Sequence, residues 1–224
     1  MIRGILIAGN ESSLFTALAN EAVKRVETFA SAVIPNRFPM PAGGLLPKSE
    51  PAGFSLSWNP ASPISARTLV LAAENRLERI SDAVLVCSPP AVFRTAEVLT
   101  PEEIDILVND HMRGWFFLVR ELALYFQRVK SGTLSFVAPE FNTSGSGKNV
   151  QTDMLGPSAS ASFRAFAQGI FTSSANESFL TMGFTASGSI VNEDFSAWLF
   201  KIIDEGSKKN SGRWNKFAKL NFFR

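Results

Sequence analysis

The sequence contains a single cysteine, a single histidine and a single tyrosine among its 224 residues. One cysteine, Cys87, excludes an internal disulfide and a cysteine-rich metal site, and it suits a reducing cytoplasm. One histidine, His111, excludes a metal centre built from several imidazoles. No run of about 18 apolar residues exists that would span a membrane, and the apolar amino terminus is too short for a signal peptide. We therefore expect a soluble cytoplasmic protein without a bound metal.

A large excess of charge of one sign is also missing. Twenty-two lysines and arginines face 20 acidic residues, which gives a formal charge of +2. This balance gives no reason to expect a nucleic-acid partner. The one local excess is the basic and aromatic stretch from 208 to 224, which we interpret as a solvated edge of the fold rather than a nucleic-acid or membrane patch. What the chain does have is core material, because 46% of its residues are hydrophobic.

The clearest regular pattern runs from Thr100 to Arg128. Thr100 is a good helix N-cap and Pro101 suits the first helical position. The apolar residues that follow recur at the spacing of one helical face: Ile104, Leu107, Val108, Trp115, Val119, Leu122 and Phe126. A glycine turn at Gly132 and an apolar strand at 133–138 come next. A long helix, a turn and a buried strand form half of a parallel α/β unit.

The same alternation extends along the chain. We expect further strands at 2–8, 29–34, 54–58, 82–87 and 179–184, a last edge strand in the tail, and helices after Ser12 or Ser13 and at 64–79, 157–171 and 194–205. Five prolines within 35–53, and the Gly, Ser and Asn content of 139–156, predict irregular segments there. Strands that lack polar alternation are buried on both faces. The pattern predicts one α/β domain over residues 1–224, a Rossmann-like doubly wound parallel sheet with helices on both faces.

Four segments resemble, in order, those of the short-chain dehydrogenase/reductase family. They are D-A-V-L-V-C-S-P-P at 82–90, L-T-P-E-E-I-D with N-D-H-M-R-G-W-F-F-L-V-R-E-L at 99–122, S-G-T-L-S-F-V-A-P at 131–139, and P-S-A-S-A-S-F-R-A-F-A-Q-G-I at 157–170. In the family these carry the Asn-Asn-Ala-Gly motif, the long helix, the catalytic serine, and the catalytic tyrosine and lysine. The resemblance covers residues 2–203 and implies the Rossmann fold and hydride transfer with a nicotinamide cofactor.

The residues of that chemistry are mostly replaced. The tyrosine, lysine and serine positions fall on Pro157, Ala161 and Ala138 (or Pro139), and only Asn109 matches the family. Proline has no proton to give, and alanine supplies neither a charge nor a hydroxyl. The single tyrosine, Tyr125, is followed four residues later by Val129, so it cannot restore the pair. The resemblance therefore predicts a fold without the catalytic residues.

The cofactor motif departs as well. The family's Gly-x-x-x-Gly-x-Gly turn falls on Gly9, Ser13 and Phe15, and a phenylalanine crowds the place of the third glycine. The Asn-Asn-Ala-Gly motif is replaced by 87–90, C-S-P-P, in which two backbone donors are lost. The positions that a dinucleotide would contact are Gly9, Asn10, Ser13, Arg37, Cys87 and Ser88. Arg37 suits either a 2′-phosphate contact or a solvated loop. We expect no cofactor, with NAD(P) as the alternative.

Three other features are best interpreted as structural rather than catalytic. His111 has no second histidine or cysteine cluster beside it, which favours a surface or hydrogen-bonded helix histidine. Cys87 ends a buried strand, which favours an inert packed thiol, with a ligand contact as the alternative. G-S-G-K at 145–148 lacks the flanking residues of a phosphate loop and is predicted to be a flexible loop over the pocket.

These observations lead to three hypotheses. The first is a protein of the dehydrogenase/reductase fold that has lost hydride chemistry and acts as a binding, scaffold or regulatory protein. It would be a homodimer through the helices at 101–128 and 157–171, as in the family. The second is an NAD(P)-dependent oxidoreductase with a rearranged active site. The third is a sensor that binds a different small ligand in the remodelled pocket.

Overall fold

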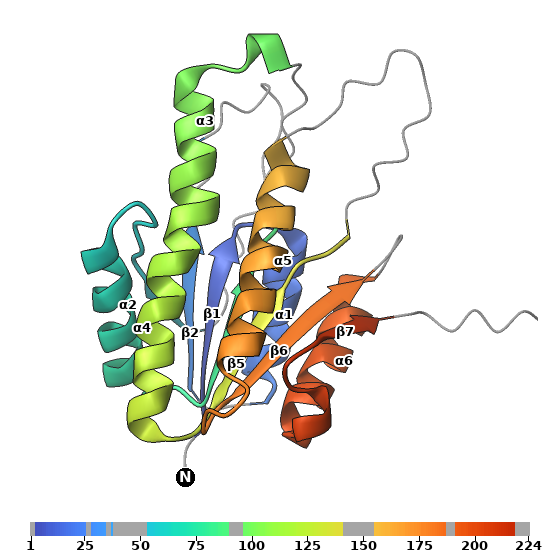
Figure 1. The fold of residues 1–224 in the computed structure, drawn as a ribbon. Helices are drawn as coiled ribbons and strands as arrows, with labels where there is room; N and C mark the ends of the chain where they lie inside the picture. Colours follow the sequence, from blue (N-terminus) through green and yellow to red (C-terminus); the bar gives the residue numbers. More distant parts are fainter. Residues whose placement is uncertain are drawn as a thin grey trace, which may run out of the picture.

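A seven-stranded, entirely parallel sheet runs through the described part of the chain, in the order β3-β2-β1-β4-β5-β6-β7 (Figure 1). The computed structural model describes residues 3–25, 28–34, 37, 53–89, 96–140, 155–186 and 191–217. The strands are β1 (Gly4–Asn10), β2 (Thr28–Ile34), β3 (Phe54–Leu56), β4 (Asp82–Val86), β5 (Thr133–Val137), β6 (Leu180–Ala186) and β7 (Trp214–Phe217). The predicted α/β class and parallel sheet are confirmed.

Helices cover both faces of the sheet. They are α1 (Ser13–Val23), α2 (Pro63–Leu77), α3 (Pro101–Val108), α4 (Gly114–Val129), α5 (Leu155–Ser173) and α6 (Asn192–Glu205), with a π-helical turn η2 (Asn109–Arg113) between α3 and α4 and the 3-10 turns η1 (Ala96–Val98) and η3 (Lys208–Asn210). One core packs α2, α4 and α5 against the sheet, and a second core packs α1 and α6 against the other face (Figure 1).

Strand β1 shows why the strands lack polar alternation. All seven of its residues are buried. Leu6 and Ala8 enter the core under α2, α4 and α5, whereas Ile5 and Ile7 enter the core under α1 and α6. Because neighbouring side chains point to opposite faces, a central strand must be apolar at every position.

The helix predicted between Thr100 and Arg128 is continuous but not regular. Thr100 is the N-cap and forms a reciprocal capping box with Glu103. Leu107, Trp115, Val119, Leu122 and Phe126 are buried as predicted. Ile104 was expected on the same face, and this is wrong, because 45% of it is exposed. The π-helical turn rotates α3 relative to α4, and α3 extends beyond the strand ends (Figure 1).

Several boundaries differ from the prediction. Strand β1 continues through Asn10, and β3 stops at Leu56 rather than Trp58. Helix α5 begins at Leu155, so Pro157 lies in its first turn, where a missing N–H costs nothing. The predicted edge strand in the tail is confirmed as β7. Most of 35–53, the stretch 141–154 with its G-S-G-K sequence, and the last seven residues lie outside the described residues.

Candidate functional site

The strand order reverses between β1 and β4, because β2 and β3 extend the sheet to one side and β5, β6 and β7 to the other. Open parallel sheets bind ligands in the crevice outside the carboxyl ends of the strands at this switch point. Asn10 is the last residue of β1, and Cys87 and Ser88 directly follow β4. The candidate site is therefore built from these strand ends and from the elements above them.

The side chain of Asn10 spans the switch point. The Ser88 N–H donates to Asn10 Oδ1 at 3.3 Å, which orients the side-chain amide. Its Nδ2 then lies 3.3 Å from Nδ1 of His111, in the π-helical turn. Because Nδ2 is a donor, Nδ1 is the acceptor and the imidazole carries its proton on Nε2. One buried asparagine thus joins β1, the segment after β4 and η2.

His111 is buried and neutral. Its pKa falls to about 4, because burial disfavours the imidazolium and the positive charge of Arg37 adds to that effect. Of the two interpretations offered for this residue, the hydrogen-bonded helix histidine is confirmed and the surface histidine is wrong.

Asp110 is fully buried beside His111, and its carboxylate forms an ion pair with the guanidinium of Arg37. Its second oxygen, Oδ2, has no hydrogen-bond partner among the described residues. Burial raises the pKa of Asp110, and the charge of Arg37 opposes that rise. The Arg37 side chain is 43% exposed. It is therefore neither buried nor a simply solvated loop residue, since it holds a carboxylate from an element 73 positions away.

The two consecutive buried polar residues, Asp110 and His111, lie within the π-helical turn. The Gly114 N–H donates to Asn109 O, five residues back, which widens the turn. Such turns are frequent at functional sites. Asn109, the residue that matches the family, accepts from Nη1 of Arg113 at 2.8 Å within its own helix turn. We name Asn10, Arg37, Ser88, Asp110 and His111 the switch-point cluster.

Sequence reasoning placed Asn10, Arg37 and Ser88 at this edge but missed Asp110 and the role of His111. The signal was present: these two polar residues interrupt the apolar face between Leu107 and Trp115. A charged residue on the buried face of a helix needs a partner, and that requirement would have pointed to the opposing loops.

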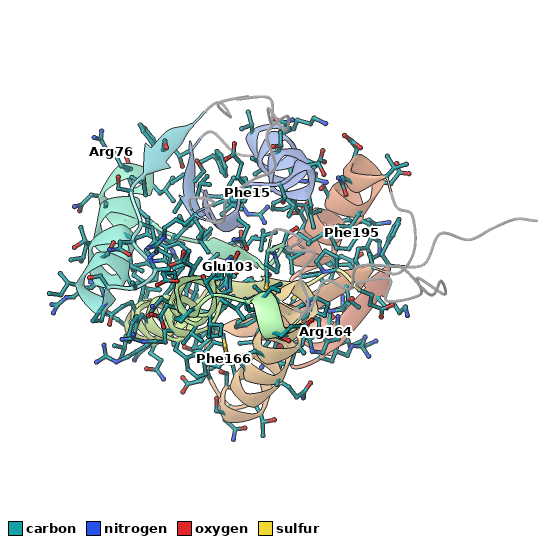
Figure 2. The ribbon with its side chains drawn as sticks, turned by 90° about the horizontal axis from the view of Figure 1, so that it is seen from above. Phe15, Arg76, Glu103, Arg164, Phe166 and Phe195 are labelled. Atoms are coloured by element: carbon teal, nitrogen blue, oxygen red, sulfur yellow. The ribbon has the colours of Figure 1, made fainter. Side chains whose placement is uncertain are left out.

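The amino terminus of α1 is occupied by internal contacts. Ser12 is the N-cap, and its Oγ accepts from the Phe15 N–H at 3.1 Å. Ser13 Oγ accepts from Nδ2 of Asn192, at the start of α6, at 3.0 Å. The ring of Phe15 is buried in the same core as Phe195 of α6 (Figure 2). Phe15 therefore fills space between α1 and the sheet, where a third glycine would permit close helix–strand packing.

Gly9 and Cys87 serve packing at this edge. A Cβ on Gly9 would lie 2.5 Å from Val86 O, so the close approach of β1 to β4 requires glycine. The Cys87 side chain is fully buried in the core under α2, α4 and α5. Burial raises its thiol pKa far above the usual range. The inert packed thiol fits this environment, and the Cys87 N–H is used in a hydrogen bond to Val137 O.

The positions that replace the family's catalytic residues have no reactive groups. Pro157 and Ala161 lie on the first two turns of α5, and Ala138 follows β5, where its carbonyl accepts from Nη1 of Arg164 at 3.1 Å. The Tyr125 hydroxyl accepts from the Ile80 N–H, just before β4 begins, and so lies toward the opposite edge of the sheet. No described residue therefore supplies a phenol to the candidate site.

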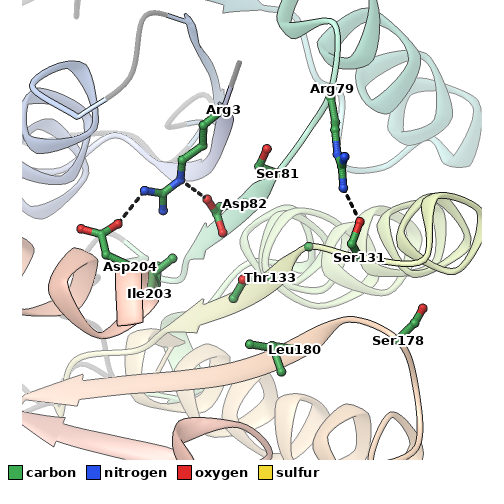
Figure 3. Close-up of a pocket in the computed structure, with 11 residues that line it drawn as sticks. Arg3, Arg79, Ser81, Asp82, Ser131, Thr133, Ser178, Leu180, Ile203 and Asp204 are labelled. Atoms are coloured by element: carbon green, nitrogen blue, oxygen red, sulfur yellow. Dashed lines mark hydrogen bonds and ion pairs between the residues drawn. The ribbon is translucent and has the colours of Figure 1, made fainter. Parts of the chain in front are cut away.

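A hollow of about 530 Å³ opens at the amino edge of the sheet (Figure 3). Arg3 pairs there with Asp82 and Asp204, each at 2.6 Å, and Arg79 donates to Ser131. Burial raises the pKa of Asp82, and the charge of Arg3 opposes the rise. These contacts tie β1, β4 and α6 together. The hollow lies at the opposite edge from the strand ends that bind ligands in such sheets, so we assign the candidate site to the carboxyl edge.

Neither a cluster of metal-binding side chains nor a membrane-spanning helix occurs within the described ranges. Those residues include no group of three or more His, Cys, Asp or Glu side chains that could hold a metal ion. None of the helices within them has both the length and the apolar character needed to cross a membrane.

Comparison with known proteins gives the fold. No protein-family model and no curated protein matches the sequence. Solved structures do match. A variant of actinorhodin polyketide ketoreductase with NADPH has a TM-score of 0.74 at 10% identity, covering 97% of this chain and 96% of that one. An NADH-dependent reductase complexed with NAD has a TM-score of 0.73 at 11% identity, covering 96% and 94%. A short-chain dehydrogenase from Bacillus anthracis has a TM-score of 0.75 at 9% identity, covering 96% and 95%. Sequence identity this low concerns architecture alone, and the resemblance found in the sequence is confirmed to that extent: the chain has the Rossmann-like fold of the short-chain dehydrogenases/reductases.

Proposed function

We propose that this chain is a non-catalytic binding or regulatory protein that uses the dehydrogenase/reductase fold without hydride transfer. The observation that carries the proposal is the switch-point cluster. Asn10 bridges the ends of β1 and β4, and Arg37 reaches across to Asp110. The chain's own side chains thus occupy the edge where such a fold would hold a dinucleotide.

The acid–base chemistry of the edge supports the same proposal. Efficient general acids and bases have a pKa near the working pH. His111 is far below it, with a pKa of about 4, and the raised pKa of Cys87 keeps its thiol protonated. The carboxylate of Asp110 is already held by Arg37. None of these groups is suited to give a proton to a carbonyl substrate at neutral pH.

The test is a calorimetric titration of the purified protein with NADPH and with NADH. We expect no saturable heat up to about 1 mM, a concentration that corresponds to roughly −4 kcal/mol of binding free energy. A thermal-unfolding scan with the same cofactors should show no rise in Tm. A cofactor that did bind, at about 100 times its Kd, would raise the free energy of unfolding by about 2.7 kcal/mol and would be detected. Micromolar binding in both assays would overturn the proposal.

An NAD(P)-dependent oxidoreductase with a rearranged site is the second candidate. Two observations favour it: Oδ2 of buried Asp110 has no hydrogen-bond partner among the described residues, and two structures of similar fold contain NADPH and NAD. It predicts cofactor binding that Asp110→Asn weakens. A small-ligand sensor is the third candidate, and it predicts a bound ligand other than a dinucleotide at the same edge.

We further propose that the partner is a second copy of the chain, bound through α3–α4 and α5. Phe116 on α4 is 51% exposed and packs against Phe166 of α5, with the two tilted rings 4.0 Å apart between centroids. Exposed small residues on α5, Ala161 and Ala165, would let another helix approach closely. Such a face is self-complementary under a twofold axis. The single buried cysteine suits assembly in the reducing cytoplasm.

A further inference from the structure

A second polar group lies at the carboxyl ends of β5, β6 and β7, away from the switch point. Its members, which we name the Arg164 cluster, are Glu140, Arg164, Thr185, Trp214 and Lys216. Arg164 projects from α5 toward these strand ends (Figure 2). Sequence reasoning did not single it out, because one arginine in a helix of small and apolar residues is usually a solvated side chain.

The guanidinium of Arg164 is held in place from two sides. Nη1 donates to Ala138 O at 3.1 Å and to Thr185 Oγ1 at 2.9 Å. Its Cζ lies 4.6 Å from the centroid of the Trp214 ring, in a cation–π contact. Two acceptors and an indole hold this guanidinium group, so the Arg164 side chain has already lost most of its rotamer freedom. Binding a ligand would therefore cost little further side-chain entropy.

Arg164 nevertheless has no counter-charge in the described part of the chain. The half-buried arginines Arg3 and Arg25 each form an ion pair with a carboxylate, whereas the acceptors on Arg164 are a carbonyl and a hydroxyl. A partly buried cation without a counter-ion is unfavourable. The remaining Nη2 and Nε donors have the geometry that binds carboxylate or phosphate oxygens in pairs.

Lys216 adds a second cation beside this fork. Thr185 of β6 is the register partner of Lys216 on β7, so their Cα atoms are about 5 Å apart. Lys216 lies on the same face of β7 as Trp214, whose ring contacts Phe171 of α5. Its ammonium pairs with Glu140 at 3.1 Å, and the Glu140 N–H donates to Ala186 O. Two cations and one carboxylate leave the group with one net positive charge.

We propose that the Arg164 cluster binds an oxyanion, the carboxylate or phosphate group of a small ligand, with Arg164 as the main contact and Lys216 as the second cation. The position agrees with ligand binding at the carboxyl edge of parallel sheets. The proposal does not depend on whether hydride transfer has been lost, because none of these residues belongs to the switch-point cluster. The competing role is a purely structural one, in which Arg164 pins α5 to β6 and β7.

The test is an NMR titration of the 15N-labelled protein with inorganic phosphate and, separately, with acetate, at constant pH and ionic strength. The readout is the indole N–H signal of Trp214, assigned with a Trp214→Phe variant. We expect a saturable shift with a Kd of about 1–10 mM for the free anions. Tighter phosphate binding would identify a phosphate ester as the ligand class, and tighter acetate binding a carboxylate.

Three variants separate binding from structure. Arg164→Gln should weaken binding by roughly tenfold or more, and Arg164→Lys should weaken it in part, because charge without the fork loses the paired hydrogen bonds. The matched control is Arg213→Gln, which removes an equal charge just before β7 from a side chain that donates to Asn210 Oδ1 and has no ion pair within the described residues. It should leave the Kd unchanged within about twofold.

Two results would overturn the proposal: a shift that does not saturate in the unaltered protein, or one that persists unchanged in Arg164→Gln. If Arg164→Gln fails to fold, as judged by the dispersion of its amide spectrum, Arg164→Lys and Lys216→Gln decide the question. Unaltered titration curves for both of these variants would then assign Arg164 a structural role only.

Discussion

His111 links the chemistry of the candidate site to the stability of the protein. Its pKa is about 4 in the folded chain and about 6.5 in an unfolded one. Between these two values the unfolded chain binds more protons than the folded chain. The free energy of unfolding therefore falls as the pH falls from about 6.5 to about 4, by up to about 3 kcal/mol. The raised pKa values of Asp82 and Asp110 act in the opposite direction in acid.

We expect this acid-dependent loss to be missing in His111→Gln, which keeps a hydrogen-bonding side chain but does not titrate. Urea unfolding of both proteins at pH 7.5 and pH 4.5 measures it, and the difference between the two proteins isolates the histidine from the carboxylates. If both proteins lose the same free energy of unfolding between these pH values, the pKa of His111 is not lowered in the folded state.

Residue identities at the edge of the sheet were predictable only where a strand end fixed them. Asn10 and Ser88 follow from where β1 and β4 end, and Pro157 and Ala161 follow from the resemblance of α5 to the family. The ion pair between Arg37 and Asp110 joins residues 73 positions apart. The interrupted apolar face indicates that Asp110 needs a partner, but the local pattern does not specify that the partner is Arg37.

Replacing a glycine by alanine is expected to destabilise the protein in β1 and to stabilise it in α5. Gly9→Ala would place a Cβ 2.5 Å from Val86 O, a backbone atom of the neighbouring strand. Because β1 is central, it cannot move aside without disturbing two ladders, and we expect a loss of about 1–3 kcal/mol. Gly169→Ala meets nothing within 4 Å on the outer face of α5. It should stabilise the helix by roughly 0.5–1 kcal/mol.

Chemical denaturation of the two glycine variants and the unaltered protein measures both the expected decrease and the expected increase in the free energy of unfolding. A neutral Gly9→Ala would mean that β1 and β4 are less tightly packed than the structure indicates.

Elements were predictable to the extent that their patterns were local. The strand β4 and the helices α2 and α6 appear within a few residues of their predicted bounds. The π-helical turn was not predictable in this way, because α3 and α4 each show a helical repeat and only one extra residue separates their phases. That residue shifts the buried face of α3, so that Glu103 is buried and Ile104 is exposed.

At the scale of the molecule, the alternation of strands and helices was enough to give the sheet. Each parallel connection must cross over with the same hand, which leaves few possible strand orders. The alternation also places helices on both faces, and α4 and α5 are neighbours of the same core. Phe116 of α4 packs against Phe166 of α5, so the outer surfaces of these two helices adjoin, and this is the surface of the proposed homodimer.

The proposed homodimer can be tested by substitution. Phe116 on α4 is 51% exposed and packs against Phe166 of α5, whereas Leu71 on α2 is exposed to a similar 48% on another helix. A buried aromatic anchor typically carries about 2 kcal/mol or more of binding energy, so Phe116→Glu should raise the dimer dissociation constant by roughly 30-fold or more. Leu71→Glu introduces the same charge and should leave it unchanged. Sedimentation velocity over a range of protein concentrations measures both. A monomeric unaltered protein would contradict the proposed homodimer, and a dimer broken by Leu71→Glu and not by Phe116→Glu would place its interface away from α4 and α5.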